Sequence, residues 1–245
     1  MTWVKICGIT NLEDALTAVD AGADALGFVF YDKSPRRINV ETAREIVANL
    51  PTHVEKVGVL VGESQAGWVD LVLRTRLTAV QLYLARETDI QPKRRKATSA
   101  IVFQKPPKVF VALSVNQFLE EDEKEGKLLA GRLVELLQET SRGSPPFSNV
   151  TFDAYFLDSG GLQQPGGTGR TFDWHRVAPV IEEMTETGMK LVVAGGLTPE
   201  NVGHAIVVLR PWGVDVSSGV EASPGKKDPD KVRAFVRAVR ETDGK

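Results

Sequence analysis

The chain has 245 residues, which is enough for two small domains or for one domain of the larger kind. Hydrophobic residues make up 42% and charged residues 25%, a balance typical of globular proteins that excludes a disordered chain. Thirty basic and 32 acidic side chains give a formal net charge of −2, so no net field favours nucleic acid or an anionic membrane as a partner.

Short runs of apolar residues, rich in Val, Leu and Phe, predict eight strands. Their nearly continuous apolar character is typical of parallel strands that are buried on both faces. In chain order the predicted strands are Trp3–Ile9, Ala25–Tyr31, Glu55–Val61, Ala79–Tyr83, Val109–Val115, Ala154–Ser159, Leu191–Gly196 and Gly213–Ser218.

Helical patterns lie between these strands. Thr10 and Glu13 form a capping-box pattern that predicts a helix beginning at Thr10. Thr198 and Asp228 each precede a proline, and we expect both to be N-caps. Leucines at helical spacing predict another helix over Glu123–Thr140.

The alternation of strands and helices predicts parallel βαβ units. Eight units in 245 residues take about 31 residues each, which fits a single (β/α)₈ TIM barrel spanning residues 1–245. A doubly wound sheet is the alternative, but the GxGxxG turn expected after its first strand is missing. We therefore predict the α/β class and one barrel domain.

Several kinds of site and segment are not expected in this chain. Cys7 is the only cysteine, and His53, His175 and His204 are scattered, so we expect no disulfide and no structural metal site. Uncharged stretches such as Val109–Leu119 fall well short of the ~20 residues that span a bilayer. The N-terminus lacks an apolar signal segment. We expect a cytoplasmic protein with no membrane or nucleic-acid partner.

Active sites of such barrels lie in the loops after the strands, so polar residues at strand ends are the candidates. Cys7 follows the apolar part of the first strand; it is either a small buried hydrophobe or a thiolate base or nucleophile. Asp158 ends the sixth strand and is either a general acid or base or a loop-capping residue. Arg36 and Arg37 are either a solvated pair or a site for a carboxylate, which arginine binds bidentately.

Glycine and serine residues close the last two strands. Gly195 and Gly196 end the seventh strand, and Ser217, Ser218 and Gly219 end the eighth. Loops at these two positions often bind phosphate through exposed backbone N–H groups. The two ends together predict a phosphate site. The glycine-rich stretch 160–170 has the composition of a mobile lid or of a merely flexible insertion.

Five motifs together resemble the phosphoribosylanthranilate isomerase family, the Amadori-rearrangement enzymes of tryptophan biosynthesis. The resemblance runs from residue 3 to about residue 236. The motifs are VKICGIT, SPRR, FLDS followed by GGTGRTFDW, AGGLTPENV, and GVDVSSGVEASPGKKD. The resemblance implies a (β/α)₈ barrel that needs no metal or organic cofactor.

Matched position by position, the resemblance implies a role for each candidate. Cys7 corresponds to the general base, Asp158 to the general acid and Arg36 to the residue that binds the anthranilate carboxylate. Asp215 corresponds to the motif aspartate of the eighth strand, and we expect it to contact the substrate. The phosphate site corresponds to Gly195, Gly196, Ser218 and Gly219.

The sequence departs from the family pattern at two strands. The fourth strand usually ends QLHG but here reads Gln81-Leu82-Tyr83-Leu84, and the expected lysine-bearing fifth strand reads VFVALSV. The segment 116–152 is longer than usual. These changes predict altered contacts at the floor of the site.

The resemblance implies conversion of N-(5-phosphoribosyl)anthranilate to 1-(2-carboxyphenylamino)-1-deoxyribulose 5-phosphate, a small phosphosugar, by a monomer or homodimer. The alternatives are a related phosphosugar isomerase or epimerase, or a barrel that binds a phosphosugar with little turnover. A histidine-pathway isomerase would carry a carboxylate where the first strand has Cys7, and a metal-dependent epimerase would need histidines at strand ends. Neither pattern is present.

Overall fold

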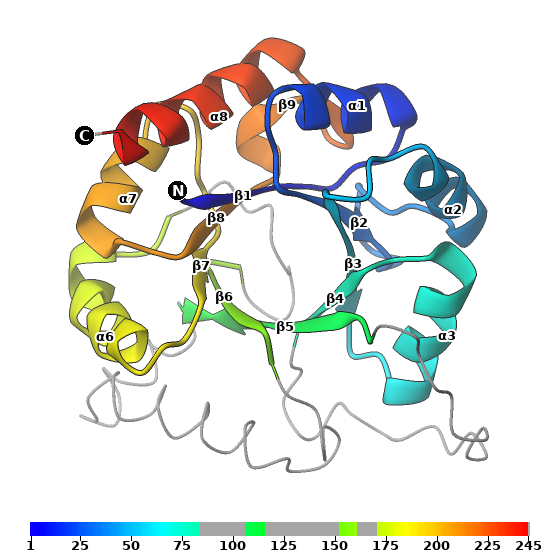
Figure 1. The fold of residues 1–245 in the computed structure, drawn as a ribbon, viewed down its shortest axis with the longest axis horizontal. Coiled ribbons are helices and arrows are strands. Elements are labelled where there is room, and N and C mark those ends of the chain that lie inside the picture. Colours follow the sequence, from blue (N-terminus) through cyan, green and yellow to red (C-terminus); the bar gives the residue numbers. More distant parts are fainter. Residues whose placement is uncertain (84–105, 116–151, 161–170, 245) are drawn as a thin grey trace.

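The computed structural model describes residues 1–83, 106–115, 152–160 and 171–244. The predicted helix Glu123–Thr140, the segment 116–151 and most of the predicted lid (161–170) lie outside these residues. Figure 1 shows a ring of strands surrounded by helices. The elements in chain order are β1 (Trp3–Cys7), α1 (Leu12–Asp20), β2 (Ala25–Val29), α2 (Val40–Ala48), β3 (Glu55–Val61), α3 (Gln65–Thr75), β4 (Ala79–Tyr83), β5 (Lys108–Ser114), β6 (Ala154–Asp158), α6 (Trp174–Glu186), β7 (Leu191–Val193), α7 (Val202–Leu209), β8 (Gly213–Val216), the 3₁₀ turn η1 (Ser218–Val220), β9 (Glu221–Ser223), β10 (Lys226–Lys227) and α8 (Pro229–Asp243).

The eight predicted strands form a closed parallel barrel in the order β1 to β8. Closure comes from the parallel pairing of β1 with β8, in which Lys5 lies opposite Asp215. The predicted TIM barrel is thereby confirmed. The prediction that residues 1–245 form one domain stays a prediction, because two long segments are not described.

Successive strand residues point alternately outward to the helices and inward to the barrel axis. The outward residues, such as Ile6 and Leu26, join the large core beneath the helices. Aromatic rings pack near the amino-terminal end of the barrel interior: Trp3 meets Phe110 and Phe156 edge to face, and it stacks on Trp212. These rings fill the barrel at the amino-terminal end of the strands, so the space for a ligand is at the other end.

Several predicted boundaries were wrong. Strands β1, β2, β7 and β8 end two or three residues earlier than predicted, because the chain turns into the next loop; Gly8, Gly195 and Gly196 adopt positive φ there. These short strands leave the glycines and serines in the loops rather than in the sheet.

Two helix starts also differ from the predictions. The N-cap of α1 is Asn11, whose side chain accepts the Asp14 N–H at 2.8 Å. Thr10 instead donates its hydroxyl to the Gly225 carbonyl, which ties this loop to the hairpin of β9 and β10. Helix α7 begins after Asn201, not after Thr198, because the Thr198 N–H donates to the Asn201 side chain and closes a separate turn.

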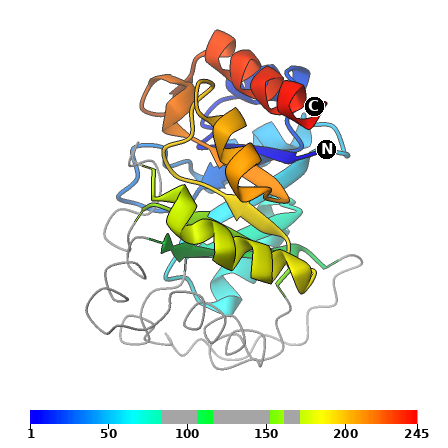
Figure 2. The ribbon, with the colours of Figure 1, turned by 90° about the vertical axis from the view of Figure 1, so that its left-hand side faces the viewer.

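The predicted start of α8 is confirmed. The Asp228 side chain accepts the N–H groups of Asp230 and Lys231, and Pro229 is the first helical residue. The apolar residues Val232, Phe235, Val236 and Val239 are buried, as their spacing predicts. Figure 2 shows α8 lying across the top of the molecule, with the N-terminus close to the chain's end. Among the described residues, no helix is long and apolar enough to cross a membrane.

Candidate active site

A pocket opens at the carboxyl ends of the barrel strands. Its empty space, with the open solvent at its mouth included, is about 630 Å³. The predicted site residues that line it are Cys7, Arg36, Asp158, Gly195, Gly196, Asp215 and Ser218. The fold thus brings together seven residues that are up to 211 positions apart in the sequence.

Cys7 lies at the end of β1, and its side chain faces the barrel interior beside that of Lys5. Burial raises the pKa of the Cys7 thiol, while the Lys5 ammonium opposes that rise and the Asp215 carboxylate adds to it. The Cys7 thiol is therefore buried, and the Lys5 ammonium lies near it. This combination suits a group that gains and loses a proton inside a pocket.

Asp158 ends β6 and is held by two donors. The Tyr83 hydroxyl donates to its Oδ2 at 2.6 Å, and the Gly160 N–H donates to its Oδ1 at 2.8 Å. Burial, followed by the nearby Asp158 carboxylate, raises the pKa of Tyr83 well above 10, so the phenol keeps its proton. Tyr83 is thus the donor that the fourth strand contributes to the Asp158 carboxylate.

Arg36 reaches the pocket from the loop after β2 but is not a free cation. Its Nε and Nη2 each donate to the Glu221 carboxylate at 2.8 Å. The Arg36 Nη1 has no hydrogen-bond partner among the described residues, so this edge of the guanidinium remains available to a ligand. Arg37 pairs with Asp32 at the surface and does not line the pocket.

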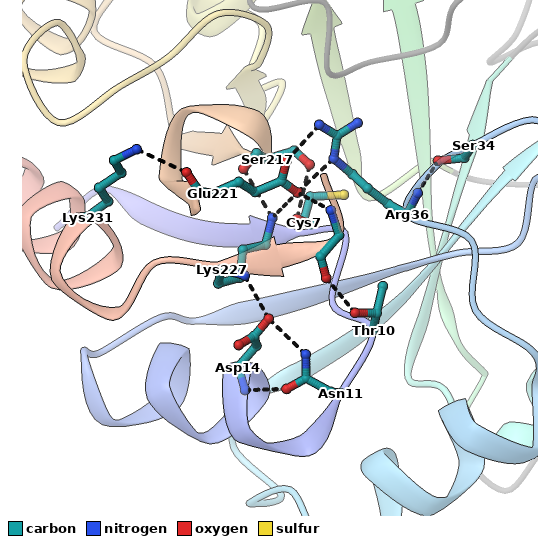
Figure 3. Close-up of polar contacts among 11 residues, drawn as sticks. Cys7, Thr10, Asn11, Asp14, Ser34, Arg36, Ser217, Glu221, Lys227 and Lys231 are labelled. Atoms are coloured by element: carbon teal, nitrogen blue, oxygen red, sulfur yellow. Dashed lines mark hydrogen bonds and ion pairs between the residues drawn. The ribbon is translucent and has the colours of Figure 1, made fainter. Parts of the chain in front are cut away.

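Glu221 is the centre of a cluster that joins the pocket to the β9–β10 hairpin (Figure 3). Besides Arg36, it accepts from the buried Lys227 ammonium at 3.0 Å and from the Gly225 N–H at 3.3 Å. Lys227 also donates to the Ser217 carbonyl at 3.1 Å, directly behind the pocket wall. The hairpin therefore sets the position of Arg36 and of the loop after β8.

Asp215 is predicted to contact substrate, and it lines the pocket. The structure also gives it an internal partner, because its Oδ1 accepts from the Lys5 ammonium at 2.9 Å. Burial raises the pKa of Asp215, and Lys5 opposes this rise. The Lys5 side chain is fully buried and that of Asp215 nearly so, and each charge compensates the other.

The predicted phosphate end of the pocket contains the loops after β7 and β8. Gly195 and Gly196 have φ values of +85° and +63°, and Ser218 begins η1. Within the described part of the chain, the backbone N–H groups of Gly195, Gly196, Ser218 and Gly219 find no acceptor. Backbone donors left free at a pocket are typical of an anion site.

Gly219 is not among the residues that line the pocket, and its contact with a ligand stays a prediction. A Cβ at this position would lie 1.9 Å from the Leu197 carbonyl oxygen. Glycine is needed here so that the loops after β7 and β8 can pack against each other. Any larger residue would disrupt the loops before it affected a ligand.

Four residues of the site were missed by sequence reasoning as functional residues: Lys5, Tyr83, Glu221 and Lys227. Lys5 could have been found, because it is two positions before Cys7 and therefore on the same strand face. Tyr83 was visible only as a departure from the family pattern. Glu221 and Lys227 lie in a loop whose path no local pattern predicts.

The described residues contain no group of three or more His, Cys, Asp or Glu side chains placed to hold a metal ion. The groups that line the pocket include a thiol, two carboxyls, a guanidinium and backbone donors. These groups suit proton transfer on an anionic ligand.

Comparison with known proteins shows which family the chain belongs to. The profile of N-(5′-phosphoribosyl)anthranilate (PRA) isomerase matches residues 4–238. The chain belongs to this family. It is 39% identical over 241 residues to the N-(5′-phosphoribosyl)anthranilate isomerase of Trichlorobacter lovleyi, covering 98% of this chain and 99% of the relative. It is 41% identical over 240 residues to that of Thermotoga maritima, with the same coverage.

Solved structures agree with the sequence relatives. The phosphoribosyl anthranilate isomerase of Thermotoga maritima is 38% identical, with a TM-score of 0.71 and coverage of 98% of this chain and 100% of that one. A second such isomerase, 37% identical with a TM-score of 0.69 and the same coverage, was solved with reduced 1-(o-carboxyphenylamino)-1-deoxyribulose 5-phosphate. Another structure is of monomers of a dimeric isomerase from Thermotoga maritima.

Membership of this family makes the chain an enzyme, an isomerase of tryptophan biosynthesis. The alternative of a different phosphosugar isomerase or epimerase family is thereby decided against. The roles of individual residues are a separate matter and rest on the geometry of the pocket.

Proposed function

We propose that this pocket converts N-(5′-phosphoribosyl)anthranilate to 1-(2-carboxyphenylamino)-1-deoxyribulose 5-phosphate, with Asp158 as the general acid and Cys7 as the general base. The observation that carries the proposal is that both side chains line one pocket, from β6 and from β1, together with Arg36 and the free backbone donors. An acid and a base facing one cavity are what an aldose-to-ketose rearrangement requires.

The first step opens the sugar ring. Asp158 donates a proton to the ring oxygen, the bond from C1′ to that oxygen breaks, and the nitrogen lone pair forms the C1′=N iminium. The Tyr83 hydroxyl can hold the carboxyl in both protonation states, because a phenol donates to a carboxylate and accepts from a carboxylic acid.

The second step moves a proton from carbon. The iminium acidifies the C2′ proton, and the Cys7 thiolate removes it, so that the electron pair forms the C1′=C2′ bond and neutralises the nitrogen. The resulting enolamine then loses its O2′ proton and gains one at C1′, which gives the ketone. No oxidant or reductant is needed, because the rearrangement only relocates protons and electron pairs.

Binding groups that line the same pocket hold C2′ near the acid and the base. The free edge of Arg36 fits the anthranilate carboxylate, since Glu221 fixes the plane of the guanidinium. The N–H groups of Gly195, Gly196 and Ser218 fit the phosphate. Such remote contacts orient the reacting carbon and so lower the entropic part of the barrier.

The test is turnover of N-(5′-phosphoribosyl)anthranilate, followed by the loss of anthranilate fluorescence. Cys7→Ala and Asp158→Asn should each lower kcat by about 10²–10⁴-fold, the usual effect of removing one positioned acid or base. Both variants should still bind the reduced product analogue. The control is Asp32→Asn, which changes an exposed carboxylate outside the pocket.

Two results would contradict the proposal. Turnover by Cys7→Ala within about threefold of the parent would make Cys7 a packing residue. Tight analogue binding by a parent protein that does not turn over substrate would instead support the binding-barrel alternative.

A further inference from the structure

An ammonium group is buried beside the thiol that we assign as the base. Lys5 and Cys7 are two positions apart on β1, so both side chains point into the barrel. Lys5 has no exposed surface and Cys7 has 8%. Lysine is rarely fully buried unless its charge is paired, so the full burial of Lys5 needs a physical explanation.

The geometry at Gly27 shows how close the two side chains are. Gly27 on β2 lies opposite Cys7, and a Cβ there would be 2.7 Å from the Cys7 Sγ and 3.0 Å from the Lys5 Cε. The sulfur and the last carbon of Lys5 are therefore within about 6 Å of each other. A side chain at position 27 would displace one or the other, so glycine leaves room for both.

The ammonium is held in place from the other side. Asp215 lies opposite Lys5 in the β1–β8 register, and its Oδ1 accepts the Lys5 Nζ at 2.9 Å. The other charged or titratable groups that act on the thiol are the Lys227 ammonium from β10 and the Tyr83 hydroxyl from β4. Lys5 is the cation with the largest effect on the thiol.

We propose that Lys5 is a positioning residue for the isomerisation: held by Asp215, its buried ammonium stabilises the Cys7 thiolate and so makes that thiol usable as a base. This inference rests on the role of Cys7 proposed above. The rival explanation is that Lys5 and Asp215 form an ion pair that only closes the barrel. The two explanations predict different titrations of the thiol.

Burial and charge act on the thiol in opposite directions. Burial raises the pKa of Cys7 and the adjacent Lys5 lowers it, whereas Asp215 raises it. If Lys5 acts by its charge, removing it should raise the pKa and removing Asp215 should lower it. If substitutions merely loosen the barrel and admit water, both should lower the pKa, because each would relieve the burial.

Because Cys7 is the only cysteine, the thiol of the whole protein can be titrated without labelling. The experiment measures the ultraviolet absorbance of the thiolate and the rate of iodoacetamide alkylation against pH. Lys5→Met should raise the midpoint by roughly 1–3 units, the effect of one opposite charge within about 4–6 Å. Asp215→Asn should lower it. Lys5→Met/Asp215→Asn should give a smaller rise than Lys5→Met alone.

The control is Lys56→Met, which removes another poorly exposed lysine, on β3, whose ammonium donates to the Pro51 carbonyl away from the thiol. It should leave the midpoint unchanged. In turnover, Lys5→Met should lower kcat/KM at neutral pH and recover part of it as the pH rises. Should Lys5→Met not fold, Lys5→Gln removes the same charge and keeps a polar group beside Asp215, and its midpoint should also rise.

The inference is overturned if Lys5→Met titrates like the parent, or if Lys5→Met and Asp215→Asn both lower the midpoint. Its failure differs from that of the proposed function. A shifted thiol with full turnover by Cys7→Ala would refute the role of Cys7 and leave the effect of Lys5 standing. An unshifted thiol with inactive Cys7→Ala would refute only the role of Lys5.

Discussion

Replacing Glu221 by glutamine tests whether the carboxylate cluster holds the pocket together. The Glu221 carboxylate balances two cations, Arg36 and Lys227, whose side chains are 12% and 0% exposed. Glutamine keeps the shape of the side chain and part of its hydrogen bonding, but it removes the negative charge. Glu221→Gln therefore leaves two poorly solvated cations next to each other without their shared partner.

The magnitude follows from the burial of the three groups. Removing one partner of a buried ion pair costs about 3–5 kcal/mol, because the remaining charge loses its compensation. For a chain of this size, 1 kcal/mol corresponds to roughly 2–4 °C in Tm. We expect Glu221→Gln to lower Tm by about 6–20 °C and to raise KM, since Arg36 loses its orientation.

The assay is thermal unfolding of the variant beside Glu41→Gln, which breaks an exposed ion pair with Arg74. The control should change Tm little, because surface pairs contribute about 0–1 kcal/mol. Equal shifts in the two variants would refute the structural importance of the cluster.

The pH dependence of the stability difference between the parent and Glu221→Gln provides a second check. Burial alone would raise the pKa of Glu221, but the hydrogen bond from Arg36 and the charge of Lys227 hold it below 4.5. A folded-state pKa below the unfolded value gives stability that is present above that value and is lost as pH falls through the folded pKa. The stability difference between parent and Glu221→Gln should therefore be full near neutrality and shrink below about pH 4.5. A difference that grows with acidity would contradict the lowered pKa.

Three further predictions concern the ligand contacts. Arg36→Ala should raise KM far more than it lowers kcat, with a loss of about 2–4 kcal/mol in steady-state kinetics; an unchanged KM would place the carboxylate elsewhere. Ser218→Asp should abolish thermal stabilisation by inorganic phosphate, whereas Ser64→Asp, which keeps a helix N-cap outside the pocket, should retain it; stabilisation of both variants would move the phosphate site. Tyr83→Phe should lower kcat/KM by about 10–100-fold without a large loss of Tm, because a hydrogen bond to a charged group contributes about 1.5–3 kcal/mol; an unaffected kcat/KM would show that Asp158 does not depend on this donor.

The sequence by itself determined the class of fold. Eight apolar strands that alternate with helices must be buried among other strands and helices. The local pattern of apolar residues shows this directly. The confirmed start of α8 at Asp228 is equally local, since a capping residue before a proline acts within one turn. Where a competing contact came from far away, as from Gly225 to Thr10, the local prediction of the helix start was wrong.

The sequence also identified seven of the residues that line the pocket, because residues at the carboxyl ends of barrel strands must meet at one face of the barrel. Cys7, Asp158 and the glycines after β7 needed only their places on the strands, whereas Asp215 came from the family resemblance. Their roles came from resemblance and remain proposals.

Only the tertiary structure decided which charges share a partner. Arg36 and Glu221 are 185 positions apart, and Lys5 and Asp215 are 210 apart, yet each pair is in direct contact. Such pairs depend on the closure of the barrel and on the path of the β9–β10 hairpin, which leave no periodic trace in either segment. A sequence shows which side chains are able to carry charge, but their effect on one another varies with distance and burial, and these are set only when the chain has closed on itself.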